Sequence, residues 1–374
     1  MVLMPMRYKH YLKNNIMKKY LLIGLIILVI GSMVIIPMVR NSSSNDTEYD
    51  SSLPSEFTFE QNLAIRYNET VELSIQVNQA IQKLELAFGD TILKSWNNPK
   101  QGIITLNFNP SMFGIGTKPI SLISKLTNGT SVNDNRMVRV LSDIVPNIWT
   151  AKIKRAYPHS TTHYTQGLEF LNNDLYEGTG QYGSSKITKV DLQTGKPDDT
   201  KSITLAGNYF GEGITILGNK VYQLTWQEQT CFIYNLPDFK LEKSISYVGE
   251  GWGLCNDGKY LIMSNGTERI TFRNPETFAI EKTIEVFDNT GPVSQLNELE
   301  YIEGKIYANV YTTTKIAVID PLTGRVESII EAGILEKEGR GFGDVLNGIA
   351  YNDGKIYMTG KNWNKLFEVE LVKP

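Results

Sequence analysis

The sequence is poor in the residues that usually build metal centres and nucleophilic sites. Its 374 residues include two cysteines, Cys231 and Cys255, and three histidines. No His–Cys group has the spacing of a zinc site, and three histidines offer few candidates for a histidine-dependent catalytic triad. We expect His159 and His163 to lie in a solvated loop. We expect the cysteines to be buried as small apolar residues, although an exported chain would permit a disulfide bond.

Positive charge is not in excess either. The chain carries 37 lysines and arginines against 40 aspartates and glutamates, which gives a net charge of −3. The sequence shows no basic stripe, so nucleic acid is not expected as a partner.

A long apolar run is present near the N-terminus. Residues 21–39 contain no charged side chain and follow five basic residues, Arg7, Lys9, Lys13, Lys18 and Lys19. As a helix this run would span roughly 28 Å, about one bilayer core. Residues 1–40 are therefore predicted to be a cytoplasmic basic flank and membrane anchor, with the remainder exported. The alternative is a cleaved signal peptide that begins at Met17, which would leave a secreted protein.

Two β-domains are predicted after this segment. Residues 41–55 are polar and are interpreted as a linker. Residues 56–146 hold short alternating strands separated by turn residues, which predicts a small Ig-like β-sandwich. This region has no cluster of reactive side chains, so we interpret it as a spacer. Residues 147–374 form the second domain.

The second domain repeats one pattern five times. An apolar residue in a first strand is followed, eight positions later, by another in a second strand. The five pairs are Leu168/Tyr176, Ile214/Tyr222, Leu254/Ile262, Leu299/Tyr307 and Ile349/Tyr357. Successive copies begin 46, 40, 45 and 50 residues apart, which predicts a five-bladed β-propeller with four strands per blade. The last repeat ends after three strands, so residues 150–156 are predicted to supply the fourth and close the ring.

The constant register predicts which residues share a site. Two positions before each first-strand apolar residue lie Gln166, Glu212, Trp252, Asn297 and Asn347. Four positions after each second-strand apolar residue lie Gly180, Trp226, Gly266, Tyr311 and Lys361. Both positions fall at the same end of an antiparallel hairpin. The two sets are therefore expected to line one mouth of the central channel.

The chemistry of these residues favours a catalytic pocket. Glu212 is their one carboxylate, and burial among aromatic rings would raise its pKa toward neutrality, as a general acid–base requires. Structural alternatives remain. Glu212 could be a salt-bridged acid in a Gly-Glu-Gly turn, and Lys361 could be a solvated lysine. The aromatic residues could be core, and Asn297 and Asn347 could be turn residues.

The same segments resemble a known family, the plant-type glutaminyl-peptide cyclotransferases, or glutamine cyclotransferases, which also has bacterial members. The resemblance covers nearly all of residues 160–370. The matching stretches are Tyr164-Thr-Gln-Gly-Leu-Glu-Phe, Leu175-Tyr-Glu-Gly-Thr-Gly, Gly211-Glu-Gly-Ile-Thr, Leu224-Thr-Trp, Gly251-Trp-Gly-Leu, Leu296-Asn-Glu-Leu-Glu, Ala308-Asn-Val-Tyr, Leu346-Asn-Gly-Ile-Ala and Thr359-Gly-Lys-Asn-Trp-Asn-Lys-Leu-Phe.

The resemblance implies a five-bladed propeller that converts an N-terminal glutamine of a peptide to pyroglutamate and releases ammonia. Its acid–base glutamate falls on Glu212. Its substrate-binding residues fall on Gln166, Trp226, Trp252, Asn297 and Lys361. A further aromatic position, usually tryptophan in the family, is Tyr311 here. No cofactor is required, and some members hold a structural calcium ion in the channel, whose ligands the sequence does not place.

The resemblance also implies roles for the residues. Glu212 would move the proton, and Lys361 or Gln166 would stabilise the oxyanion. Asn297 would hold the α-amine or the scissile carbonyl. The expected partners are peptides with a free N-terminal glutamine and, through residues 1–40, a membrane; the protein is expected to be a monomer. The rival interpretations are a non-catalytic exported propeller that binds peptide or sugar, and a calcium-dependent hydrolase or lactonase.

Overall fold

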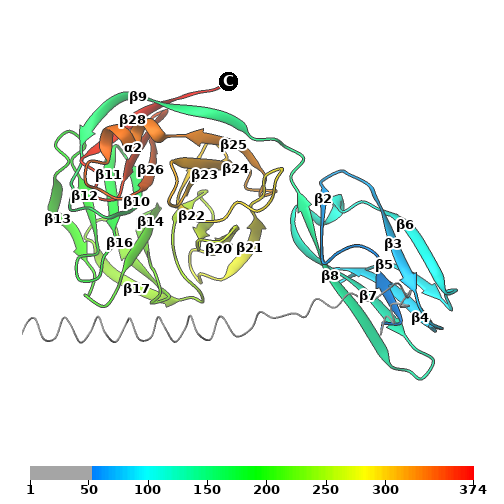
Figure 1. Cartoon of the computed structure of the whole chain (residues 1–374). Helices are drawn as coiled ribbons and strands as arrows, with labels where there is room; N and C mark the ends of the chain where they lie inside the picture. Colours follow the sequence, from blue (N-terminus) through cyan, green and yellow to red (C-terminus); the bar gives the residue numbers. More distant parts are fainter. Residues whose placement is uncertain (1–52) are drawn as a thin grey trace, which may run out of the picture. The chain divides into compact units, whose positions relative to one another are not determined.

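The computed structural model describes residues 53–374, and nearly all of their regular structure is β-strand (Figure 1). The predicted anchor and most of the predicted linker lie outside the described residues. Within residues 53–374, no helix has the length and apolar character needed to span a membrane. The prediction of an all-β protein is confirmed for the described part.

Residues 53–146 form two sheets that enclose one core. One sheet has the strand order β1-β3-β6 and the other the order β2-β8-β7-β4-β5. The strands are β1 (Ser55–Phe57), β2 (Asn62–Arg66), β3 (Val71–Val77), β4 (Lys83–Phe88), β5 (Thr91–Asn97), β6 (Gly102–Phe108), β7 (Gly116–Lys125) and β8 (Ser131–Leu141), with a short 3-10 helix η1 (Ser111–Phe113). Alternation sets the inward face: in β3, Leu73, Ile75 and Val77 are buried.

Three sheets of four strands follow along the chain, each with its strands in sequence order and antiparallel. The first holds β10 (Thr165–Leu171), β11 (Asp174–Thr179), β12 (Lys186–Val190) and β13 (Pro197–Thr204). The second holds β14 (Gly211–Leu217), β15 (Lys220–Thr225), β16 (Thr230–Asn235) and β17 (Lys240–Ser246). The third holds β18 (Leu254–Asn256), β19 (Leu261–Ser264), β20 (Arg269–Arg273) and β21 (Ile280–Glu285).

The last sheet joins the two ends of this region. It has eight strands in the order β22-β23-β24-β25-β9-β28-β27-β26 (Figure 1). The strands are β22 (Leu296–Ile302), β23 (Lys305–Val310), β24 (Lys315–Ile319), β25 (Val326–Glu331), β26 (Leu346–Asn352), β27 (Lys355–Gly360), β28 (Lys365–Val372) and β9 (Asn147–Pro158). One helix, α2 (Gly333–Gly339), lies between β25 and β26 in the chain.

Strand β9 has two partners. Its residues 150–158 pair antiparallel with β28, from Thr150 opposite Val372 to Pro158 opposite Lys365. The predicted closing strand at residues 150–156 is therefore confirmed. Its first residues, from Asn147, also pair in parallel with β25. That second pairing was not predicted, because a parallel partner 181 residues away leaves no local signal in the sequence.

The first hairpin strands share a bulge. The pairing with the second strand shifts between Thr165 and Gly167 in β10 and between Gly211 and Ile214 in β14. The same shift recurs in β22 and β26, after Leu296 and after Leu346. A bulge adds an unpaired residue and redirects its side chain. In each of these strands the redirected residues include the one that the register assigns to the site.

Both cysteines are buried and free, Cys231 in β16 and Cys255 in β18. The expectation that they act as small apolar residues is confirmed. Burial raises the pKa of both thiols, and the pKa of Cys231 is about 12. Neither sulfur is therefore a thiolate near neutral pH.

Candidate active site

The register-derived residues meet in one pocket of about 250 Å³. Its wall consists of Tyr164, Gln166, Gln181, Phe210, Glu212, Trp226, Trp252, Asn297, Tyr311 and Lys361. Seven of the eight predicted site residues are among them. The eighth, Asn347, lies behind the wall, where its Nδ2 donates to Gln166 Oε1 at 3.3 Å and to the carbonyl of Thr165 at 2.9 Å. Asn347 therefore orients Gln166 instead of lining the pocket.

Three wall residues, Tyr164, Phe210 and Gln181, were not predicted from the sequence. Tyr164 and Phe210 both lie two positions before a predicted site residue, Gln166 and Glu212. A comparison of that third position between the repeats would have found them. Gln181 follows Gly180 in the turn after β11, and no repeat marks it.

Glycines allow the backbone segments around the pocket to approach one another closely. Gly167, Gly213 and Gly253 occupy equivalent positions, and a Cβ on Gly213 would lie 2.5 Å from the amide nitrogen of Leu254 in the next sheet. The fourth sheet has Glu298 at this position. Its carboxylate accepts the N–H of Leu168 at 3.3 Å and the N–H of Ile349 at 2.9 Å. Glu298 thus links the strands that carry Gln166, Asn297 and Asn347.

Glu212 is a buried residue of the pocket wall, with 5% of the residue exposed. Gln166 Nε2 donates to its Oε1 at 3.0 Å. Burial holds the pKa of Glu212 well above its usual range; Lys361 opposes this shift, and the negative charges of Glu250 and Glu228 reinforce it. Within residues 53–374 no cation lies within 4.0 Å of its carboxylate, so the salt-bridged alternative is not supported.

Lys361 follows β27 and is 2% exposed, which excludes the solvated alternative. Its Nζ lies 4.7 Å from the ring centroid of Tyr164 and 5.0 Å from that of Tyr311. Burial lowers the pKa of Lys361, while Glu212 and Asp344 raise it in part. The cation–π contacts and the nearby acids hold a positive charge at the pocket wall.

The aromatic rings pack edge to face. Trp252 and Tyr311 have ring centroids 5.6 Å apart, and Phe210 and Trp226 have centroids 5.7 Å apart. Gly266 leaves space for one of these rings, because a Cβ there would lie 2.6 Å from Trp252 Cζ2. Such packing gives a rigid apolar wall beside the buried acid.

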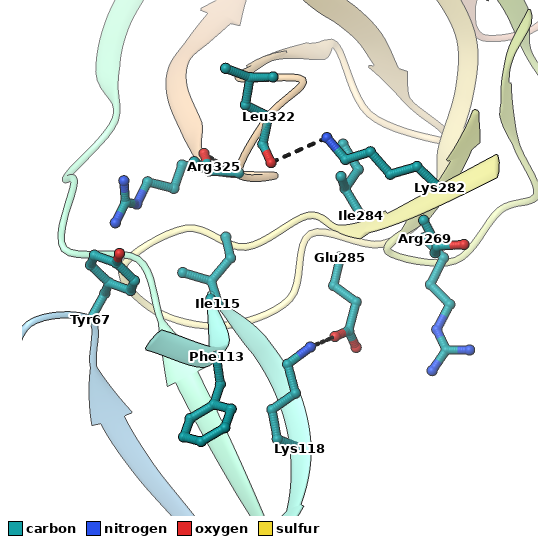
Figure 2. A pocket seen from close by; sticks show the side chains of 13 residues that line it. Tyr67, Phe113, Ile115, Lys118, Arg269, Lys282, Ile284, Glu285, Leu322 and Arg325 are labelled. Carbon is teal, nitrogen blue, oxygen red and sulfur yellow. Dashed lines mark hydrogen bonds and ion pairs between the residues drawn. The ribbon is translucent and has the colours of Figure 1, made fainter. Parts of the chain in front are cut away.

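A larger cavity of about 450 Å³ lies elsewhere, among residues of β7, β20, β21 and the β24–β25 turn (Figure 2). Its lysines already have partners: Lys118 pairs with Glu285 at 2.5 Å, and Lys282 donates to the carbonyl of Leu322 at 3.3 Å. None of the predicted site residues lines it. Of these two cavities in the described chain, the smaller one is therefore the candidate active site.

Comparison with known proteins identifies the family. The sequence model described as glutamine cyclotransferase matches residues 124–371. The chain belongs to the glutamine cyclotransferase family. A relative named glutaminyl-peptide cyclotransferase, from Arabidopsis thaliana, is 38% identical over 238 residues, which cover 61% of this chain and 73% of the relative.

A solved structure supports this family assignment. The crystal structure of Myxococcus xanthus glutaminyl cyclase is 37% identical, with a TM-score of 0.58, and the match covers 61% of this chain and 99% of that one. The region that carries the pocket therefore has the fold of a glutaminyl cyclase.

The two loop histidines are buried, so the expectation that they are solvated was wrong. His159 and His163 are 8% and 1% exposed. His159 Nε2 lies 3.0 Å from Glu177 Oε1, and His163 Nδ1 lies 2.6 Å from Glu177 Oε2. Glu177 is a fully buried acid of β11 and needs such partners. The sequence gives no sign of this contact, because Glu177 lies in the following hairpin and at no position of the predicted site.

This cluster, which we call the His–Glu–His cluster (His159, His163 and Glu177), holds two loops together. His159 Nδ1 lies 2.8 Å from the carbonyl of Trp363, and the N–H of Asn362 donates to the carbonyl of His163 at 2.7 Å. It therefore joins the segment that precedes Gln166 to the turn that follows Lys361. The two histidines lower the pKa of Glu177 despite its burial, and Glu177 raises the pKa of His159.

We expect Glu177→Gln to destabilise the protein by about 3 kcal/mol, because it removes one partner of a buried charged group. The matched control is Glu370→Gln, which breaks the exposed pair with Lys154 and should cost less than about 1 kcal/mol. Urea unfolding of the two variants measures the difference. A Glu177→Gln variant as stable as the control would contradict the assignment of a charged cluster.

The effect of Glu177→Gln should also depend on pH. The lowered pKa of Glu177 contributes stability above about pH 4.3 that is lost as pH falls. The raised pKa of His159 contributes stability below about pH 6.5 that is lost as pH rises. The stability difference between wild type and variant should therefore be largest between these two values. Unfolding curves at about pH 4, 5.5 and 8 test this.

Proposed function

We propose that the protein is a glutaminyl-peptide cyclotransferase, which converts the N-terminal glutamine of a peptide to pyroglutamate and releases ammonia. The observation that carries this proposal is the pocket. It places one buried acid between amide, lysine and aromatic side chains at the positions that the family resemblance assigns to the active site. The family match and the names of the two relatives support it.

The reaction closes a ring within one molecule. The free α-amine attacks the γ-carboxamide carbon, a C–N bond forms, and the bond from that carbon to the amide nitrogen breaks. Glu212 takes the proton that the attacking amine loses and gives it to the leaving nitrogen, which departs as ammonia. A raised pKa suits both steps, because the group must accept and return a proton near neutral pH. The pocket contributes mainly by orienting the two ends of the same residue.

The other polar groups have matching tasks. Lys361 and Gln166 stabilise the negative charge that develops on the carbonyl oxygen. Asn297 Oδ1 is buried and has no hydrogen-bond partner within residues 53–374. A buried acceptor without a donor suits the N–H groups of the substrate α-amine better than a peptide carbonyl. The rings of Trp226, Trp252 and Tyr311 hold the side chain and exclude water.

The finer architecture is also part of the proposal. We infer a five-bladed propeller in residues 147–374, supported by five hairpins of one register and by the division of the eight-stranded sheet between two blades that share β9. An Ig-like sandwich in residues 56–146, acting as a spacer, is supported by two packed sheets with a single core. Export through residues 1–40 and a monomeric state remain proposals from the sequence.

We propose that the reaction needs no cofactor. A structural calcium ion in the channel is not favoured by the residues there. The buried acids Glu169, Glu298 and Glu300 already accept backbone N–H groups. In residues 53–374 the one group of three metal-ligand side chains with converging atoms is the His–Glu–His cluster, and two imidazoles do not suit calcium.

The test compares three versions of one peptide, beginning with glutamine, glutamate or acetylated glutamine, with ammonia release and mass change as readouts. We expect the glutamine form to react far faster than the glutamate form at pH 7. A glutamate would have to expel hydroxide, and its charge would approach Glu212 in a poorly solvated pocket. The acetylated form should not react, because its nitrogen cannot attack.

Three outcomes contradict the proposal. Equal rates on the glutamine and glutamate forms would remove the carboxamide from the reaction. Hydrolysis of an internal bond would favour the hydrolase interpretation. Binding of all three peptides without turnover would favour the non-catalytic propeller.

A further inference from the structure

One carboxylate outside the pocket wall holds two of its tryptophans. Glu250 Oε2 accepts the indole N–H of Trp226 at 2.8 Å and the indole N–H of Trp252 at 3.0 Å. Its other oxygen accepts Gln227 Nε2 at 3.1 Å. Trp226 follows β15 and Trp252 precedes β18, so one side chain joins wall residues from two neighbouring sheets.

The repeat places Glu250 at the mouth. It lies four positions before Leu254, the offset at which Tyr164 and Phe210 precede Leu168 and Ile214. Those two residues line the pocket. The position therefore belongs to the same layer of the channel, and in the third repeat it carries a negative charge instead of a ring.

We infer that Glu250 is a positioning residue of the pocket: its carboxylate sets the spacing of Trp226 and Trp252 and places a negative charge near the acid–base Glu212. The inference rests on the proposed function and adds a residue that holds the pocket wall in place. A carboxylate shared between two indole groups fixes both rings, because each N–H left without it would lose a charge-assisted hydrogen bond.

The negative charge of Glu250 also affects the acid–base residue Glu212. Burial raises the pKa of Glu212, Lys361 lowers it, and Glu250 and Glu228 raise it further. The charge of Glu212 in turn contributes to the raised pKa values of Tyr182 and Tyr247. Despite the burial of Glu250, the hydrogen bonds from Trp252, Gln227 and Trp226 lower its own pKa, so it stays charged at neutral pH.

Glu228 provides a matched control. Its carboxylate is also partly buried and also raises the pKa of Glu212. Its partners are different: it accepts the hydroxyl of Tyr182 at 2.9 Å and the N–H of Phe210 at 3.2 Å, and no indole. Variants of Glu228 therefore change the charge near Glu212 without releasing the tryptophans.

The experiment uses the full chain with four variants, Glu250→Gln, Glu250→Ala, Glu228→Gln and Glu228→Ala. For each, the pH profile of kcat/KM for a glutamine-initiated peptide is measured, together with tryptophan emission and its quenching by acrylamide. Both Gln variants should move the acid limb of the profile to lower pH, because a negative charge beside Glu212 has been removed. Glu250→Gln keeps an oxygen for the indoles, so its emission should stay close to wild type.

Glu250→Ala should behave differently from every other variant. We expect KM to rise at least about tenfold, equivalent to about 1.4 kcal/mol, with altered emission and easier quenching. Glu228→Ala should leave emission and quenching unchanged. The inference is overturned if Glu250→Ala keeps the wild-type KM and emission, or if Glu228→Ala reproduces its whole effect. If wild type releases no ammonia, the proposed function fails, while emission and quenching still test whether Glu250 fixes the two rings.

Discussion

Glu212→Gln is expected to reduce ammonia release from a glutamine-initiated peptide by roughly 100- to 10,000-fold, the usual cost of losing a general acid–base. Glu212 is the one carboxylate in the pocket wall. An amide at this position keeps the size of the side chain and still offers an oxygen to Gln166 Nε2. It cannot accept the proton of the attacking amine. The loss should therefore fall on kcat, with a small change in KM.

The fold of this variant should be intact. Glu212 lies in the bulge of β14, where its backbone is outside the ladder, and removal of a buried acid with a raised pKa relieves a desolvation cost. Circular dichroism and the melting temperature check this point. Near wild-type turnover in a folded variant would remove Glu212 from the mechanism.

A fragment that begins at residue 161 is expected to aggregate or unfold, while one that begins at residue 147 folds and turns over substrate. The shorter fragment lacks β9, which pairs with both β25 and β28. Its loss exposes two sheet edges at once and removes the strand that joins the chain ends. The longer fragment loses only the first two sheets and the contacts they make, such as the partly buried Lys118–Glu285 pair. It keeps β9 and both partners of that strand.

Melting curves and ammonia release of the two fragments, beside a protein that begins at residue 53, measure this effect. The same melting temperature for both fragments would contradict a closing role for β9. An inactive fragment from residue 147, with activity retained in the protein from residue 53, would show that residues 53–146 are more than a spacer.

Much of the site follows from the sequence because the repeat fixes the register. Once Leu168, Ile214 and Leu299 are aligned, residues at one offset must meet at one end of the hairpins, whatever the loops between them do. Gln166, Glu212 and Asn297 were located in this way, and the structure brings them together. The rigid period of the strands makes this inference possible.

Contacts between residues at different repeat positions could not be predicted from the sequence. His159 and His163 are buried in contact with Glu177, which lies in β11 and belongs to no site pattern. Asn347 shares the register of Gln166 but is turned behind it, because its side chain satisfies the carbonyl of Thr165. The parallel pairing of β9 with β25 is equally non-local. These features depend on packing between residues that are far apart in the sequence. The periodicity of the strands gives no information about such packing.

The bulges of the first strands bear on how this protein could change its activity. Gln166, Glu212 and Asn297 sit at positions left out of the pairing, while Thr165, Gly211 and Leu296 beside them keep the strands in register. A mutation at a bulge position can therefore replace the chemistry without removing a ladder hydrogen bond. Selection for a new substrate could therefore act on these few side chains while the sheets fold as before. The same fold can in this way carry a different reaction.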